Sequence, residues 1–268
     1  MENKIIVVGY GIMTTGIVKN ILSKTDFDVS IVSKHLTERI NCTVMSTFAG
    51  DYDLVIGCFK NDRESFNFWS EESVLKSLRE NNSICIELSS LSMKCIEDWY
   101  KLVDKNKLTA VEVPITGSRI GAENGTLPLF LYSEIKNIYY KNIFCEFCKA
   151  ISTKQYNFHN RVNPTRFKLM YNAWGAVMLY TLREFNPENF EYGKDLSLVN
   201  HIVESDGWMS LFASSKLKQV QDNKSMQSDF KLRYMIKDLK LDTEFTLLAI
   251  QFYFDSTMMW KKFNRRVI

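Results

Sequence analysis

Short apolar runs that alternate with helical or polar segments fill the first half of the chain and constrain its fold most strongly. Runs of this kind are expected as strands where both faces of a parallel sheet are buried. Their alternation with helical segments predicts a mainly parallel sheet covered by helices. The expected strands are Lys4–Gly9, Asp28–Ser33, Asp53–Cys58, Ser83–Leu88 and Thr109–Val113.

The pattern changes after about Asn163, where apolar residues begin to recur at helical spacing. Asn163-Pro164 marks the start of a long helix, because proline suits the first helical turn. We therefore predict two domains, with a boundary between residues 162 and 163 and an all-α second domain. Its expected helical stretches are Arg166–Phe185, Leu196–Leu217 and Phe230–Phe263.

Composition excludes several classes of partner. The formal net charge of +3 is small and evenly spread, so the chain lacks the basic patch that nucleic-acid binding needs. No apolar run reaches the length of a membrane span, and the first strand begins too close to Met1 to leave room for a signal peptide. The six cysteines lie mostly in apolar stretches, where a reduced thiol acts as a small hydrophobe. We expect a cytoplasmic protein without a nucleic-acid or membrane partner.

Metal binding is not expected. Cys145 and Cys148 have the spacing of half a zinc site or of a redox pair. No second cysteine pair and no suitably spaced histidines accompany them.

A glycine turn follows the first strand directly. Gly9, Tyr10, Gly11, Ile12 and Met13 form the turn, and the helix that it opens is expected to continue through Thr14 to Ser23. A turn at this place in a strand–helix–strand unit is typical of a dinucleotide site, where backbone amides meet the pyrophosphate. The alternative is an ordinary strand-to-helix turn. Thr14 occupies the position of the usual third glycine and Gly16 comes two residues later, which we expect to weaken binding without abolishing it. The first domain, 1–162, is thus predicted to be of the Rossmann type.

The end of the second strand indicates which dinucleotide is bound. It reads Ile31-Val32-Ser33-Lys34-His35 and lacks the acidic residue that holds the ribose hydroxyls of NAD. The Ser33 hydroxyl and the Lys34 ammonium group suit the extra phosphate of NADP. We therefore predict NADPH as the cofactor, with NAD disfavoured. The alternative for Lys34 is a solvated loop lysine.

The segment Pro114–Leu127 carries the most specific motif, Pro-Ile-Thr-Gly-Ser-Arg-Ile-Gly-Ala-Glu-Asn-Gly-Thr-Leu. It resembles the substrate signature Pro-Val-Ser-Gly-Gly-x-x-Gly-Ala-x-x-Gly-Thr-Leu of the β-hydroxyacid dehydrogenase family, which includes 3-hydroxyisobutyrate dehydrogenases and imine reductases. The resemblance implies that Thr116, Gly117 and Ser118 bind the substrate. Thr116 keeps the hydroxyl of the signature serine, whereas Ser118 replaces a glycine. The alternative is a glycine-rich surface loop.

Three further segments are similar to this family. Gly9–Ile21 is similar to its opening Gly-Leu-Gly-x-Met-Gly turn, and Asp53–Asp62 with Ile86–Ser90 resemble its later cofactor-lining strand ends. The resemblance implies that Cys58, Phe59 and Ser90 line the cofactor site. It also implies that Lys237, near the end of the chain, closes over the cofactor.

Lys168 and Asn172 resemble the lysine and asparagine that face the substrate in this family. A spacing of four residues puts both on one helical face. The resemblance implies that Lys168 is the general acid and base and that Asn172 positions it. Tyr171 departs from the family, which has an asparagine there. The alternative for Lys168 is an exposed helix lysine.

Together these features predict an NADPH-dependent oxidoreductase that transfers a hydride between nicotinamide and a small hydroxy acid or carbonyl substrate. One alternative is an imine reductase-like enzyme of secondary metabolism, which the retained Lys168 disfavours and the aromatic residues Tyr171, Trp174 and Trp208 favour. Another is a catalytically silent dinucleotide-binding protein. A homodimer is expected because related enzymes pair through the helical domain and the apolar stretch Phe245–Trp260 would be hard to keep solvated in a monomer.

Overall fold

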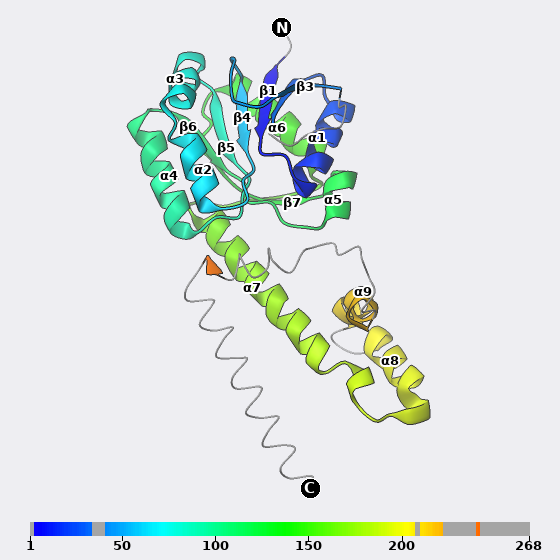
Figure 1. The fold of residues 1–268 in the computed structure, drawn as a ribbon. Helices are drawn as coiled ribbons and strands as arrows, with labels where there is room; N and C mark the ends of the chain where they lie inside the picture. Colours follow the sequence, from blue (N-terminus) through cyan, green and yellow to red (C-terminus); the bar gives the residue numbers. More distant parts are fainter. Residues whose placement is uncertain (1–2, 34–40, 207–209, 222–239, 242–268) are drawn as a thin grey trace. The chain divides into compact units, whose positions relative to one another are not determined.

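The computed structural model describes residues 3–33, 41–206, 210–221 and 240–241 (Figure 1). The chain divides into two compact units, Met1–Leu169 and Met170–Ile268. The first unit has an α/β fold, and the described part of the second is helical. The functional division into 1–162 for cofactor and 163–268 for substrate and dimerisation stays a prediction.

An eight-stranded sheet forms the centre of the first unit, with the strand order β3-β2-β1-β4-β5-β6-β7-β8. Strands β1 to β6 run parallel to one another, β7 is antiparallel to β6, and β8 is parallel to β7. The five predicted strands correspond to β1, β2, β4, β5 and β6 and are confirmed. The strands are β1 (Lys4–Val8), β2 (Asp28–Val32), β3 (Thr43–Met45), β4 (Leu54–Gly57), β5 (Ile84–Glu87), β6 (Thr109–Glu112), β7 (Pro128–Ser133) and β8 (Lys154–Asn157).

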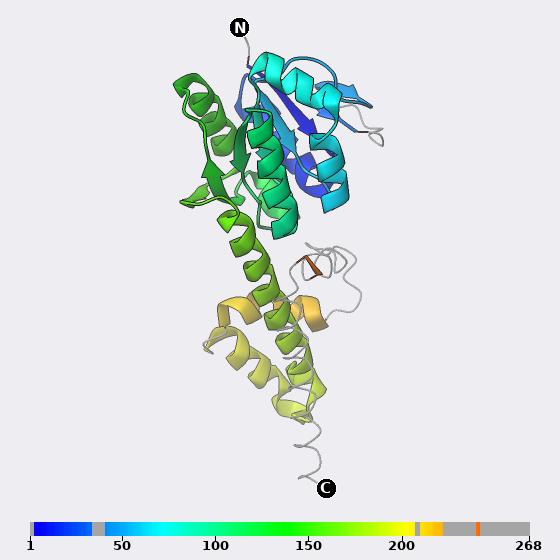
Figure 2. The same cartoon turned by 90° about the vertical axis from the view of Figure 1, so that its left-hand side faces the viewer.

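Helices cover both faces of this sheet (Figure 2). Alternate residues of β1 point to opposite faces, as strand geometry requires: Ile5 and Val7 belong to one buried cluster, and Ile6 and Val8 to the other. The first cluster includes residues of α1 (Ile12–Lys24), α5 (Arg119–Asn124) and α6 (Ile138–Ile151). The second includes residues of α2 (Asp62–Trp69), α3 (Glu72–Asn81) and α4 (Met93–Lys105).

Helix α1 packs against α5 by backbone contact at Gly16. A Cβ atom added there would lie 2.5 Å from the carbonyl carbon of Ala122, closer than real Cβ contacts occur. The Asn20 side-chain amide donates to the carbonyl oxygens of Ala122 and Glu123 at 2.8 and 3.0 Å. Gly16 therefore allows α1 and α5 to approach closely, and Asn20 fixes how the two helices are aligned.

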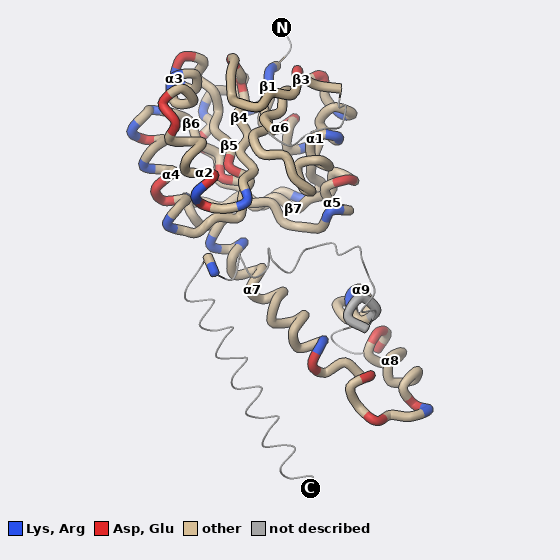
Figure 3. The backbone as a smooth tube through the Cα atoms, viewed as in Figure 1, with Lys and Arg blue, Asp and Glu red and all other residues tan. Residues whose placement is uncertain are grey.

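Acidic and basic residues are interspersed on the helices of the first unit (Figure 3). Several pairs are spaced by four residues within a helix or at its start, an arrangement that adds little stability at an exposed surface. They include Lys60–Glu64, Lys76–Glu80, Lys94–Asp98 and Arg119–Glu123.

The helical part of the chain begins with α7 (Asn163–Glu184), followed by the short 3-10 turns Pro187–Asn189 and Gly193–Asp195, α8 (Leu196–Ser205) and α9 (Ser210–Gln221). Leu182, Ala213 and Leu217 form a small buried cluster.

The stretch predicted as Leu196–Leu217 is divided between two helices, and the sequence Ser205-Asp206-Gly207 is typical of a helix end. The stretch Phe230–Phe263 lies outside the described residues except for 240–241, and the apolar segment Phe245–Trp260 that motivates the predicted homodimer lies wholly outside them. Within the described part, no helix is long and apolar enough to cross a membrane.

We expect Gly16→Val to lower the free energy of unfolding by about 3 kcal/mol, because the added side chain must push backbone atoms of α5 away. Gly121→Ala, on the facing helix, is the matched control. Its Cβ would lie 3.5 Å from the nearest atom of Leu127, and stability should stay equal or rise by up to about 1 kcal/mol. Urea unfolding measures both, and equal stabilities for the two variants would contradict the close approach of α1 and α5.

Candidate functional site

Most of the predicted site residues lie in the loops that follow the carboxyl ends of the parallel strands. In open α/β sheets, ligands bind in the crevice outside these ends. Lys34 and Lys237 lie outside the described residues. The loops carry Gly9, Tyr10 and Gly11 after β1, Ser33 after β2, Cys58 and Phe59 after β4, Ser90 after β5, and Thr116, Gly117 and Ser118 after β6.

Gly9 joins the ends of three neighbouring strands. Its φ angle is +91°, in the region that favours glycine. A Cβ atom there would lie 2.2 Å from the carbonyl oxygen of Cys58. The Gly9 N–H donates to the Val32 carbonyl at 3.2 Å, and the Cys58 N–H donates to the Val8 carbonyl at 2.9 Å. A glycine is therefore required here by both conformation and packing.

The absence of a side chain at Gly11 has a different explanation. Its φ angle of −139° is open to any residue, and no described atom lies within 4 Å of the position that its Cβ would take. The protein's own packing therefore does not require a glycine, and the absence of a side chain leaves the turn open. The amides of Ile12 and Met13 belong to the first turn of α1, where amides have no acceptor within the helix.

Thr14, at the position of the usual third glycine, is buried, and its side chain hydrogen-bonds to the backbone of the turn. Its hydroxyl accepts from the Gly11 N–H at 2.6 Å and lies 3.1 Å from the Gly11 carbonyl oxygen, to which it can donate. The side chain thus caps α1, and the close packing of α1 is provided by Gly16 instead.

The loops after β4 and β5 are held by Glu87, which is fully buried at the end of β5. Its carboxylate accepts from the Ser65 hydroxyl at 2.6 Å, from the Trp69 indole at 2.7 Å, and from both the N–H and the hydroxyl of Ser89. Ser89 Oγ in turn accepts from the Phe59 N–H at 2.6 Å. Burial raises the pKa of Glu87, and these donors oppose the rise.

Glu87 is not among the predicted site residues, although it fixes the loops that carry Phe59 and Ser90. The sequence signal is slight: an acidic residue closes the otherwise apolar run Ile84-Cys85-Ile86. An acid at the end of a buried strand needs donors, and these come from α2 and from the following loop.

The Thr116–Ser118 loop connects β6 to α5. Thr116 is 7% exposed, and its N–H donates to the Pro128 carbonyl at 3.4 Å. Gly117 has a φ angle of +121°, so glycine is favoured there. The Ser118 hydroxyl accepts from the Gly121 N–H at 3.3 Å and caps α5. Ser118, which replaces a family glycine, therefore has a structural role.

Lys168 is buried on α7, with only 6% of its surface exposed. Its neighbour Phe167 packs edge-to-face against Phe130 of β7, with ring centroids 4.7 Å apart. Asn172 follows one helical turn later and is half-buried, whereas Tyr171 is exposed. Lys168 is therefore not the exposed helix lysine that the sequence analysis gave as the alternative.

Groups of three or more His, Cys, Asp or Glu side chains able to hold a metal ion do not occur among the residues that the structure describes.

Residues 4–139, just over half of the chain, match the family model of the NAD binding domain of 6-phosphogluconate dehydrogenase. The chain belongs to this family. The membership confirms the resemblance to the β-hydroxyacid dehydrogenases and identifies an NAD(P)-dependent oxidoreductase. A comparison with curated protein sequences finds no match.

Solved structures share the fold. Psf3 in complex with NADP+ and 2-OPP has a TM-score of 0.72 at 16% identity, covering 92% of this chain and 92% of its own. The 3-hydroxyisobutyrate dehydrogenase of Mycobacterium tuberculosis with L-serine has a TM-score of 0.71 at 16% identity, covering 90% and 85%. An imine reductase variant from Myxococcus stipitatus with NAD+ has a TM-score of 0.61 at 13% identity, covering 94% and 92%.

The glycine turn of this NAD(P)-binding domain fits the cofactor's pyrophosphate. The open side of Gly11 admits a phosphate close to the backbone. The first-turn amides of Ile12 and Met13, together with the positive end of the helix dipole, suit its charge. The buried Thr14 side chain does not fill the open space beside Gly11.

Gly11→Ala should therefore weaken NADPH binding at least about tenfold, or about 1.4 kcal/mol, while the free energy of unfolding falls by less than about 1 kcal/mol. The added methyl group occupies the open side of the turn and strains no backbone angle. Fluorescence titration and thermal melting measure the two effects. Ser23→Ala, in the last turn of the same helix, is the control and should bind as the wild type does. Unchanged NADPH affinity in Gly11→Ala would contradict the placement of the phosphates.

Proposed function

We propose that this protein is an NADPH-dependent oxidoreductase that transfers a hydride between nicotinamide and a small hydroxy acid or carbonyl substrate, with Lys168 as the general acid and base. The burial of Lys168 carries the proposal. Most lysines are exposed, so the burial of this one sets it apart, and a positioned lysine can act as a general acid or base. A buried lysine on a helix that starts next to β7 is therefore a candidate for chemistry.

The bound nicotinamide supplies or accepts the hydride. In the direction of reduction, the Lys168 ammonium group donates a proton to the substrate oxygen, and in oxidation the neutral amine accepts it. Asn172, four residues later on α7, is assigned to hold the lysine and the substrate oxygen in place.

The Thr116–Ser118 loop is assigned to a polar head group of the substrate, such as a carboxylate. The Ser118 hydroxyl already accepts from Gly121, yet a hydroxyl that accepts can still donate. The likeness to a 3-hydroxyisobutyrate dehydrogenase holding L-serine supports a small substrate that bears a carboxylate.

The choice of NADPH rests on the end of β2. Ser33 follows the strand directly, and its N–H donates to the Met45 carbonyl at 2.9 Å. This is where NAD enzymes place an acidic residue, and the sequence offers Ser33 and Lys34 instead. A hydroxyl and an ammonium group favour a phosphate monoester over a neutral ribose. The likeness to a structure holding NADP+ supports the same choice.

Imine reduction is the second candidate. Tyr171, which replaces a family asparagine, is 47% exposed, and Trp174 on the same helix is 65% exposed. These aromatic side chains favour a bulkier and less polar substrate than a simple hydroxy acid. The retained Lys168 favours a carbonyl substrate, whose oxygen needs a proton.

Replacing Lys168 tests the proposed chemistry. With NADPH and a panel of 2-oxo acids, aldehydes and imines, Lys168→Ala should lower kcat by about 10²–10⁴-fold on the best substrate, the usual contribution of a general acid. Arg166→Ala removes an exposed cation from the same helix and should leave kcat unchanged. NADPH affinity, measured in parallel, should not change in either variant.

Equal turnover by Lys168→Ala and the wild type would overturn the acid–base role. No turnover of any carbonyl or imine by the wild type, with NADPH still bound, would favour a catalytically silent dinucleotide-binding protein.

A further inference from the structure

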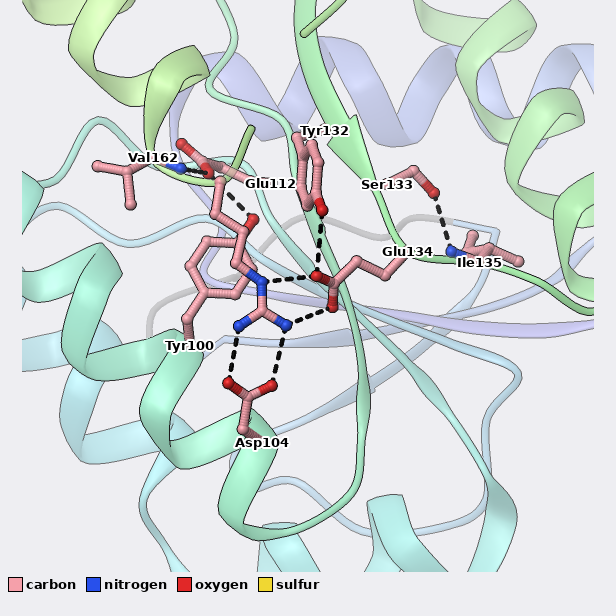
Figure 4. Close-up of polar contacts among 9 residues, drawn as sticks. Tyr100, Asp104, Glu112, Tyr132, Ser133, Glu134, Ile135 and Val162 are labelled. Atoms are coloured by element: carbon pink, nitrogen blue, oxygen red, sulfur yellow. Dashed lines mark hydrogen bonds and ion pairs between the residues drawn. The ribbon is translucent and has the colours of Figure 1, made fainter. Parts of the chain in front are cut away.

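Glu112, the last residue of β6, is a fully buried acid that binds the start of α7 (Figure 4). One carboxylate oxygen accepts from the Val162 N–H at 2.9 Å and from the Tyr100 hydroxyl at 3.0 Å. The other accepts from the Thr165 N–H at 2.8 Å. Thr165 belongs to the first turn of α7 and Val162 directly precedes it, and at a helix start N–H groups lack partners and a negative charge is favoured. Glu112 thus caps α7 from a strand about 50 residues earlier in the chain.

Arg161, just before α7, is held on several sides. Its guanidinium group makes paired contacts with Asp104 at 2.7 and 2.9 Å and with Glu134 at 2.6 and 2.8 Å. The guanidinium carbon lies 4.5 Å from the centre of the Tyr100 ring. Two-pronged contacts of this kind fix orientation as well as position. The chain therefore enters α7 from a fixed point.

Val162, between Arg161 and the helix, has a φ angle of +67°. For a β-branched residue this left-handed conformation is a true outlier, and it persists only where the surroundings enforce it. The Glu112 carboxylate on the Val162 N–H and the clamp on Arg161 are the contacts that enforce it. Strain is thus stored where α7 begins.

The first turn of α7 determines where Lys168 lies. Thr165, Lys168 and Leu169 are 1%, 6% and 2% exposed, and their spacing of three and four residues puts them on one buried face. Thr165 is bound by Glu112, and Lys168 follows it after a single helical turn. A shift in the first turn is therefore passed directly to Lys168.

We propose that Glu112 is a positioning residue for Lys168, which acts by holding the strained first turn of α7. This inference rests on the proposed acid–base role of Lys168. Glu112 is assigned no contact with substrate or cofactor. Its loss should affect the chemical step more than the binding of either ligand.

Glu112→Gln tests the proposal, because its side-chain amide has one acceptor oxygen and cannot replace both carboxylate oxygens. We expect kcat to fall by at least about tenfold, while KM and NADPH affinity change less than about twofold. Amide hydrogen exchange of the peptide 160–170 should become faster. Glu80→Gln is the control: this exposed acid on α3 pairs with Lys76 and has no part in the start of α7, so kcat should stay within about twofold.

Rescue separates positioning from a merely structural role. Val162→Gly removes the strain, because glycine adopts a positive φ freely, so the double variant Glu112→Gln/Val162→Gly should recover most of the lost kcat. If Glu112→Gln does not fold, Glu112→Asp replaces it. Its side chain is one methylene shorter and cannot reach both amides, so the same loss and the same rescue are expected.

Wild-type kcat in Glu112→Gln, with Lys168→Ala inactive, would overturn the positioning role and leave the proposed function intact. An equal kcat loss in Glu80→Gln, or no recovery in the double variant, would also overturn it. Full activity in Lys168→Ala would instead show that the proposed function itself has failed.

Discussion

The close approach of β1 to β4 at Gly9 is the contact on which the candidate site depends. A side chain there would collide with the carbonyl oxygen of Cys58, so only glycine lets the two strand ends meet. Gly9 also takes the positive φ angle that starts the turn into α1. The turn, the open side of Gly11 and the first-turn amides follow from this local geometry. It is also why the dinucleotide is expected at the carboxyl edge of the sheet.

Two buried carboxylates extend this organisation away from the glycine turn. Glu87 and Glu112 are partners in the register of β5 and β6, and each is the last residue of its strand. Glu87 fixes the loops assigned to the cofactor, and Glu112 fixes the helix that carries Lys168. Burying an acid is costly unless donors surround it, and each of these has at least three. Burial raises the pKa of both groups.

The sequence predicts the parts of the fold whose signal is local. The apolar runs identify the five central strands, and Gly9-Tyr10-Gly11 identifies the turn, because strand, turn and helix adjoin in the chain. The added edge strands were not predictable in the same way: all four residues of β8 are exposed, and β3 has three residues with none buried. An edge strand with both faces exposed has no apolar pattern to recognise.

The site shows the same limit. Thr14 looked like a defect in the glycine pattern, yet its hydroxyl caps α1, a role that depends on the fold of the turn. Glu87 and Glu112 carry little signal because their donors, such as Trp69 and Val162, lie far away in the sequence. Long-range hydrogen bonds of this kind are set by the tertiary structure. Lys168 could be singled out only by its resemblance to a family motif, since composition and spacing do not distinguish a buried lysine from an exposed one.

The most direct test of the dinucleotide site is a fluorescence titration of the purified protein with NADPH and NADH in parallel, because each mechanistic step requires the cofactor. We expect saturable NADPH binding and an affinity for NADH at least about tenfold weaker, or about 1.4 kcal/mol. Equal affinities would contradict the assignment of Ser33 and Lys34 to the phosphate. Binding of neither nucleotide would contradict the dinucleotide site and the enzymatic function built on it.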